Sequence, residues 1–255
     1  MTPRLAWIYI LTLLIQTTCG LAAPTRADSA SNIPLRILPL GASITWGQNS
    51  PTGNGYRAHL RNQLTSAGWN VDMVGSKKNG DMKDNDVEAH PGDTIAQVKA
   101  ASENSYRYKP NVVLINAGTN DCRLNNQIST AGDRMRSLIE GLLKAAGNGK
   151  EPLIVLSTLL PSGQKEIAKN TPSVNAQYRD LVKRMRKEGV SIILAEMNGK
   201  DPLIKYPKDY TTGGKVDDTH PNDEGYRKMA SIWYEAIVDA AESGLIREPA
   251  AVDKC

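Results

Sequence analysis

The feature that most constrains the fold is a fivefold alternation between short apolar runs and longer stretches with helical spacing. The apolar runs are apolar on both faces, which is typical of buried parallel strands. They cover residues 35–40, 71–74, 112–116, 153–157 and 190–195. Helices are predicted over residues 56–67, 94–108, 131–146, 172–187 and 222–243. This alternation predicts a three-layer α/β/α sandwich with a five-stranded, mainly parallel sheet.

The chain length is consistent with a single domain behind a short leader. A chain of 255 residues with 40% hydrophobic content can bury one sizeable core. Residues 1–23 are typical of a signal peptide, because Arg4 precedes an apolar run over 5–15 and small residues end at Ala22 and Ala23. An uncleaved N-terminal anchor is the alternative. We therefore expect one domain over residues 24–255, secreted to the extracellular space and free of the membrane after cleavage.

The charge and the cysteines limit the partners. The formal net charge is +4 and there is no block of basic residues, so a nucleic-acid partner is not expected. Cys19 lies inside the predicted signal peptide, which leaves Cys122 and Cys255. An even pair in a secreted chain predicts one disulfide, and two free thiols are the alternative. We expect the mature chain to be a monomer.

Candidate functional residues follow the predicted strands. Ser43 comes after the first strand, Gly92 after the second and its long loop, and Asn120 after the third. Asp217 and His220 come shortly before the last helix. Because sites in open parallel sheets form at the carboxyl ends of the strands, we expect these loops to meet at one edge.

This set of side chains suits acyl transfer. Ser43 can attack a carbonyl carbon, and His220 can take the serine proton and return it to the leaving alcohol. A carboxylate must orient the imidazole, and Asp217 can do so if its segment turns tightly. Asp218 is the rival for this role.

The negative oxygen that forms during acyl transfer needs donors already in place. The backbone N–H groups of Ser43 and Gly92 and the side-chain amide of Asn120 are the predicted donors. Taken singly, these residues have ordinary interpretations: Ser43 as a helix cap, Asn120 as a turn residue and His220 as an exposed loop residue. Their joint placement after successive strands favours a catalytic site.

No metal or other cofactor is expected. The three histidines, at 59, 90 and 220, do not form a zinc-binding pattern. Asp84, Asp86 and Glu88 alternate like ligands of a hard cation, although the run lacks the glycine and distal glutamate of an EF-hand loop. A structural Ca²⁺ near these three carboxylates remains open at this point.

The motifs together resemble the SGNH (GDSL-type) hydrolase superfamily. GASITWG at 41–47 resembles its first block, with Ser43 as nucleophile, and Gly92 stands at the oxyanion glycine of the second. GTND at 118–121 resembles the third block, and DDTHPN at 217–222 resembles the fifth, with Asp217 and His220. The likeness spans about residues 34–241. It implies a flavodoxin-like hydrolase fold and serine-dependent ester hydrolysis.

Three further segments resemble carbohydrate esterase family 3. They are NGYR at 54–57, VDMVGS at 71–76 and DNDVEAHPG at 84–92. The resemblance implies deacetylation of an acetylated polysaccharide such as xylan, or of a small ester. A lipase or lysophospholipase is the rival, but the connection over 75–93 is polar and charged, which suits sugar better than lipid.

Ala42 departs from the superfamily pattern, and Ala89 stands where a glycine is expected. The superfamily usually has Asp at the position of Ala42, where it braces the nucleophile loop through hydrogen bonds. The resemblance therefore implies that this loop is braced differently here. It also leaves a second interpretation, a weakly active relative that binds carbohydrate.

Overall fold

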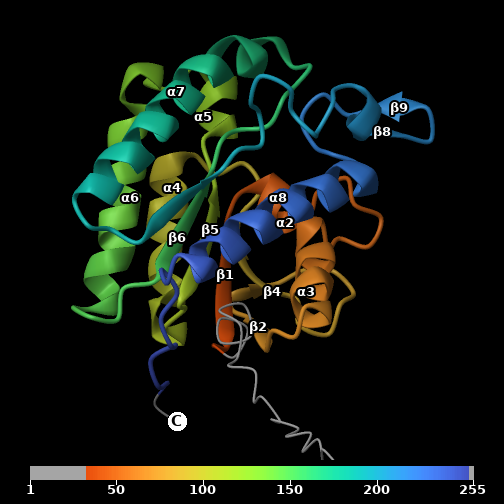
Figure 1. Cartoon of the computed structure of the whole chain (residues 1–255). Coiled ribbons are helices and arrows are strands. Elements are labelled where there is room, and N and C mark those ends of the chain that lie inside the picture. Colours follow the sequence, from red (N-terminus) through yellow and green to blue (C-terminus); the bar gives the residue numbers. More distant parts are fainter. Residues whose placement is uncertain (1–32, 253–255) are drawn as a thin grey trace, which may run out of the picture.

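The computed structural model describes residues 33–252, which form a sheet between two layers of helices (Figure 1). The strands of the main sheet are β1 (Leu35–Gly41), β2 (Val71–Met73), β3 (Lys77–Lys78), β4 (Asp86–Ala89), β5 (Val112–Asn116), β6 (Leu153–Ser157) and β7 (Ile192–Ala195). The predicted signal peptide at residues 1–23 lies outside the described residues, as does Cys255.

Helices occupy most of the chain between these strands. They are α2 (Ser43–Trp46), α3 (Tyr56–Ser66), α4 (Ile95–Ser102), α5 (Thr119–Arg123), α6 (Ala131–Ala146), α7 (Lys165–Lys187) and α8 (Asp223–Glu242). Short 3-10 helices are η1 (Glu103–Tyr108), η2 (Ile128–Thr130) and η3 (Lys208–Tyr210), and a hairpin is formed by β8 (Thr211–Thr212) and β9 (Lys215–Val216). Within residues 33–252, no helix combines the length and the apolar character needed to cross a membrane.

The sheet has the parallel architecture that the apolar runs predict. Its order is β3-β4-β1-β5-β6-β7, and β2 also pairs with β1. The amino end of β1 pairs with β2 and its carboxyl end with β4, so these two short strands share one side of β1. All five predicted strands are confirmed, and their order 2-1-3-4-5 is the flavodoxin-like one. The antiparallel β3 and the split row next to β1 bring the described sheet to seven strands.

Alternation along the strands builds two cores, one on each face of the sheet. Ile37, Val112 and Leu114 pack with residues of α3 and α8, whereas Leu38 and Val113 pack with residues of α4, α6 and α7. Figure 1 shows α3 and α8 on one side of the sheet and α4, α6 and α7 on the other. The two cores fix the sheet, and the sheet fixes where each following loop begins.

Three features of the local structure differ from the prediction. The helix predicted over 94–108 is α-helical only to Ser102 and continues as the 3-10 helix η1. The connection over 75–93 looks polar in sequence, but it contains the strands β3 and β4. Val87, Glu88 and Ala89 of β4 are buried. Helix α7 begins at Lys165, with Pro172 inside it, whereas the sequence places its start at the proline. Proline is commonest in the first turn of a helix, which is why the earlier turns were missed.

The predicted disulfide between Cys122 and Cys255 is not confirmed, and Cys255 lies outside the described residues. Cys122 is a fully buried free thiol, and burial raises its pKa to about 11. It lies in α5, beyond the carboxyl end of β5. The end of the described chain lies at the opposite edge, where Asn111, just before β5, donates a hydrogen bond to the Arg247 carbonyl at 2.7 Å. Residues 247–251 therefore lie at the opposite edge of the sheet from Cys122.

Candidate active site

Ser43 lies at the sharp turn that follows β1. A Cβ atom on Gly41 would lie 2.3 Å from Thr45 Oγ1 and 2.4 Å from the Asn116 carbonyl, so glycine is required for this turn. Ala42 occupies the cap position of α2, and Ser43 is the first helical residue. Ser43 is therefore not the helix cap. Its hydroxyl lies 2.9 Å from His220 Nε2, which joins two segments 177 residues apart.

Asp217 orients the other side of the His220 ring. His220 Nδ1 lies 3.0 Å from Asp217 Oδ2 and 3.1 Å from Oδ1. The backbone N–H groups of Thr219 and His220 also donate to Oδ1, each at 2.8 Å. Burial opposes ionisation of this carboxyl, but the donors outweigh it and the pKa of Asp217 lies below its usual value. The tight turn that the sequence required of residues 217–220 is confirmed.

Asp218, the rival for this role, faces elsewhere. Its Oδ1 accepts a hydrogen bond from the Tyr206 hydroxyl at 2.6 Å. Its backbone carbonyl accepts hydrogen bonds from Ser162 Oγ at 2.5 Å and from the Gly163 N–H at 3.0 Å. Asp218 therefore connects the 217–220 turn to the loop after β6, and Asp217 is the carboxylate on the imidazole.

The predicted oxyanion donors follow strands that are paired in register beside Ser43. Gly41 is aligned with Ala89 of β4 and with Asn116 of β5, so the loops bearing Gly92 and Asn120 begin next to the Ser43 turn. One Nδ2 hydrogen of Asn120 is donated to the Asp93 carbonyl, at 2.9 Å. Within residues 33–252, no hydrogen bond occupies the N–H of Ser43 or of Gly92.

The loop that carries Gly92 is held at both ends by carboxylates whose burial the sequence does not predict. Glu88 is fully buried and accepts hydrogen bonds from Ser105 Oγ at 2.5 Å, the Ser76 N–H at 3.2 Å and His90 Nε2 at 2.8 Å. Burial raises the pKa of Glu88, but these donors outweigh it and the pKa lies below its usual value.

The second carboxylate is Asp121, next to Asn120. It is fully buried, and its Oδ2 accepts the Ile95 N–H at 2.9 Å while its Oδ1 binds Arg134 at 3.0 Å. Asn120 and Asp121 therefore fix Asp93 and Ile95, just after Gly92. Both Glu88 and Asp121 stand inside segments already noted for their motifs, but charge alone gave no signal that they are buried.

The described residues contain no group of side chains suited to hold a metal ion. Asp84 accepts hydrogen bonds from Arg61 Nε at 2.7 Å and from the Met73 N–H. Asp86 forms an ion pair with Lys78 at 3.2 Å. Glu88 points to its own buried donors. The alternating carboxylates that resembled Ca²⁺ ligands thus bind separate partners in the protein.

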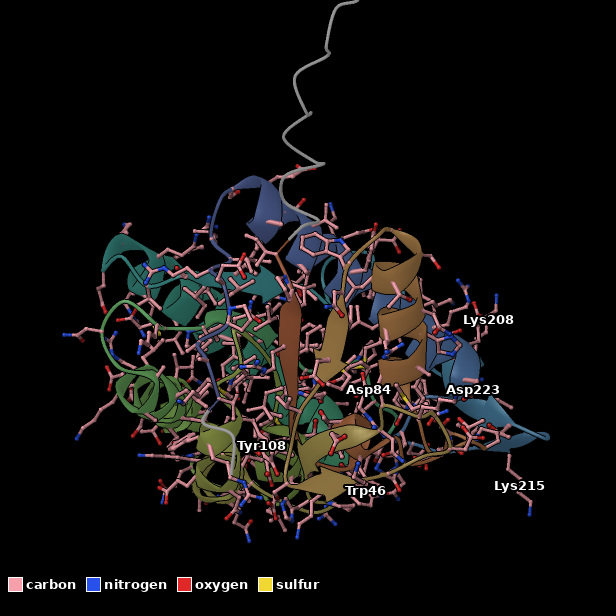
Figure 2. All side chains as sticks on the ribbon, turned by 90° about the horizontal axis from the view of Figure 1, so that it is seen from below. Trp46, Asp84, Tyr108, Lys208, Lys215 and Asp223 are labelled. Atoms are coloured by element: carbon pink, nitrogen blue, oxygen red, sulfur yellow. The ribbon has the colours of Figure 1, made fainter. Side chains whose placement is uncertain are left out.

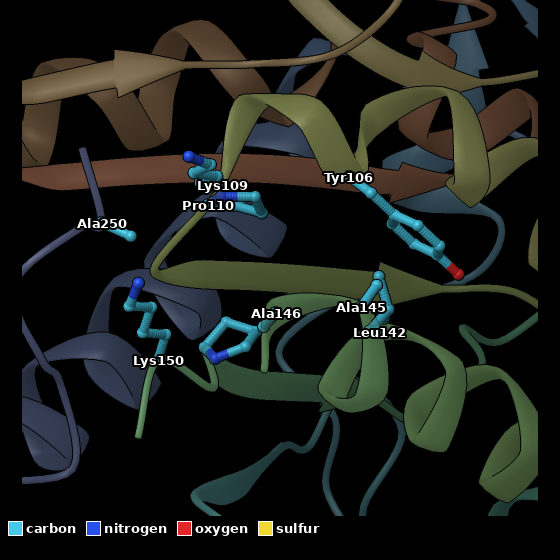
Figure 3. Close-up of a pocket in the computed structure, with 9 residues that line it drawn as sticks. Tyr106, Lys109, Pro110, Leu142, Ala145, Ala146, Lys150 and Ala250 are labelled. Atoms are coloured by element: carbon cyan, nitrogen blue, oxygen red, sulfur yellow. The ribbon is translucent and has the colours of Figure 1, made fainter. Parts of the chain in front are cut away.

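The cavity in Figure 3 lies at the other edge of the sheet. Pro110 and Pro152, which line it, stand just before β5 and β6, whereas Ser43 follows the carboxyl end of β1. The rest of the wall includes the aliphatic side chains of Leu142, Ala145 and Ala146 in α6. This cavity is separate from the Ser43 site.

The fold and the site together define an α/β domain in which successive hydrogen bonds join a serine, a histidine and an aspartate at the carboxyl edge of a parallel sheet. Such a set can activate a serine hydroxyl for attack on an ester carbonyl. Residues 40–228 match the GDSL-like Lipase/Acylhydrolase family, and the chain belongs to that family.

Two relatives align with most of this chain. It is 29% identical to the "Multidomain esterase" of Ruminococcus flavefaciens over 89% of this chain and 31% of that protein. It is 26% identical to the "Acetylxylan esterase" of Xylanibacter ruminicola over 80% of this chain and 43% of that protein. The chain thus spans less than half the length of these two relatives.

A solved structure is similar over most of this chain. The family 3 carbohydrate esterase of Clostridium thermocellum superposes with a TM-score of 0.69 at 25% identity, over 82% of this chain and 98% of that one. The resemblance to carbohydrate esterase family 3 is therefore found in three dimensions as well as in the motifs.

The buried Glu88 carboxylate makes the stability of the fold depend on pH. Because its pKa is lowered in the folded state, ionised Glu88 stabilises the fold above the pKa of an unfolded glutamate, about 4.3. That contribution is lost as pH falls through the lower folded value. We expect Glu88→Gln to lower the free energy of unfolding at pH 7 by about 1–3 kcal/mol, and the difference from wild type to shrink in acid. Urea unfolding at pH 7, 5 and 3 measures this, and a difference independent of pH would contradict it.

Proposed function

We propose that the chain is a serine esterase that removes acetyl groups from an acetylated plant cell-wall polysaccharide such as xylan. The observation that carries the proposal is the continuous hydrogen-bond path from Ser43 Oγ through His220 to Asp217. The names of the acetylxylan esterase relative and of the family 3 carbohydrate esterase support the substrate class. The leader-like residues 1–23 support secretion.

In the proposed ester hydrolysis, each of these groups carries out one step. Ser43 Oγ attacks the acetyl carbon as its proton passes to His220 Nε2, and the carbonyl electron pair moves onto the oxygen. The donors of Ser43, Gly92 and Asn120 receive that negative oxygen. Collapse breaks the bond between the acetyl carbon and the sugar oxygen. That oxygen takes the proton from His220 and departs as a hydroxyl, and Ser43 remains acetylated. Water, deprotonated by His220, then releases acetate and restores Ser43.

Asp217 does not need to gain a proton in this cycle. Its lowered pKa keeps Asp217 ionised while His220 carries the transferred proton, so the carboxylate stabilises the positive imidazolium. The backbone donors of Thr219 and His220 hold the carboxylate in place throughout.

The surface next to Asp217 leaves a second candidate substrate to be tested. The β8–β9 hairpin ends at Val216, which is 46% exposed and directly precedes Asp217. Lys215 points outward from the same hairpin (Figure 2). An exposed apolar residue beside the site is compatible with a longer acyl chain, as in a lipase or lysophospholipase. The charged side chains of residues 75–93 favour a polar substrate instead.

We predict that the wild-type chain releases acetate from acetylated xylan and from an aryl acetate, and that Ser43→Ala loses at least about 10⁴-fold in kcat/KM on both. Acetate assays over a series of acyl lengths provide the measurement. Activity that peaks on long acyl chains would contradict the polysaccharide substrate. Full activity of Ser43→Ala would refute the mechanism, and a wild type that binds xylan without releasing acetate would favour the binding-only relative.

The two neighbouring aspartates provide a matched pair of variants. We predict that Asp217→Asn lowers kcat by about 10³–10⁴-fold, because the imidazole loses its orienting negative charge. Asp218→Asn should stay within about threefold of wild type, since an asparagine oxygen can still accept the Tyr206 hydroxyl. Steady-state kinetics on an aryl acetate distinguish them, and the reverse order of effects would assign the role to Asp218.

A further inference from the structure

The Ser43 and His220 segments are joined directly by a side chain outside the catalytic set. Asn49, three residues after α2, donates from Nδ2 to the His220 carbonyl at 3.0 Å and to the Pro221 carbonyl at 3.3 Å. We propose that Asn49 is a positioning residue that holds His220 Nε2 at hydrogen-bonding distance from Ser43 Oγ. This inference rests on the proposed function.

The rest of the His220 segment is anchored away from Ser43. The Asp217 N–H donates to the Tyr210 carbonyl at 3.0 Å, and the Asn222 N–H donates to the Asp209 carbonyl at 2.8 Å. The Asp218 contacts reach the loop after β6. These bonds set the shape of the segment but do not set its distance from Ser43, so a direct tie is needed to fix the Ser43–His220 separation.

Neighbouring residues strengthen the connection without replacing it. The Tyr226 hydroxyl donates to the Gln48 carbonyl at 2.6 Å, and Ser50 Oγ donates to Asp223 Oδ1 at 2.8 Å. Both reach α8. Among residues 33–252, Asn49 is the side chain from the serine segment that hydrogen bonds to the backbone of His220 itself.

The backbone of Asn49 explains why asparagine suits this position. Its φ is +68°, in the left-handed region that asparagine tolerates better than most residues. Its amide must present nitrogen to the two carbonyl oxygens, since carbonyls only accept hydrogen bonds. An aspartate would fit the same backbone but would place oxygen against oxygen.

This tie also accounts for Ala42. Alanine provides no cap hydrogen bond for α2. The other end of that helix is held instead, because Arg57 Nη2 and Asn79 Nδ2 donate to the Trp46 carbonyl at 3.2 and 2.6 Å. Because Asn49 follows three residues after Trp46, the nucleophile segment is braced from its carboxyl side.

The test compares Asn49→Gly and Asn49→Asp with wild type. Glycine keeps the positive φ and removes the donor, and aspartate keeps the side-chain shape and reverses its hydrogen bonding. The matched control is Asn125→Gly, because Asn125 also has a positive φ, of +50°, and contacts Asn170. Ser43→Ala sets the level of inactive enzyme.

We expect both Asn49 variants to lose about tenfold or more in kcat on an aryl acetate, with KM within about twofold, because proton transfer and not substrate contact is disturbed. Asn125→Gly should keep wild-type kcat, and thermal unfolding should show that Asn49→Gly is folded to the same extent as this control. Wild-type kcat in folded Asn49→Gly would overturn the role of Asn49 alone. An inactive wild type would overturn the proposed function and this role with it.

Discussion

The hydrogen bond between Ser43 Oγ and His220 Nε2 is the interaction on which the arrangement of the site depends. At 2.9 Å it joins residues 177 positions apart, and neither side chain can perform acyl transfer without the other. The parallel sheet places Ser43, since β1 lies between β4 and β5 and ends at Gly41, where there is no room for a residue with a side chain. The turn at 217–220 places His220, since Asp217 binds both the ring and two backbone N–H groups.

Buried polar groups hold the loops that complete the site. Arg57, fully buried, donates to the carbonyls of Trp46, Gly53, Asn79 and Asn85. Glu88 and Asp121 are equally buried and secure the two ends of the Gly92 loop. Burying a charge is costly unless hydrogen bonds compensate it, so each of these residues fixes the groups to which it is hydrogen bonded. The same rigidity is what an oxyanion site requires, because donors must be in place before charge develops.

The sequence predicted the parts of the fold that follow from periodicity. Apolar runs located five strands of the parallel sheet, and i, i+3, i+4 spacing located the long helices. The structure brings Ser43, Asp217 and His220 into contact and places the Gly92 and Asn120 loops beside them, because loops at the carboxyl ends of parallel strands share one edge.

What the sequence could not show depends on contacts between distant residues. Strand β4 was missed because Asp86 and Glu88 look like loop residues until Ser76, Ser105 and His90 surround the glutamate. The pairing of Cys122 with Cys255 is not confirmed, and cysteine counting carries no information on where in the fold a cysteine lies. Asn49 gave no signal, since its partners are backbone carbonyls 171 and 172 positions away.

The central claim is that Ser43 is a nucleophile activated by His220 and Asp217. An aryl organophosphonate reacts with an activated serine and leaves a stable adduct, which peptide mass spectrometry can locate. We predict one adduct per chain, on the peptide that contains Ser43, and its absence in Ser43→Ala. A folded wild-type chain that stays unlabelled, or that carries the adduct on another residue, would contradict the claim.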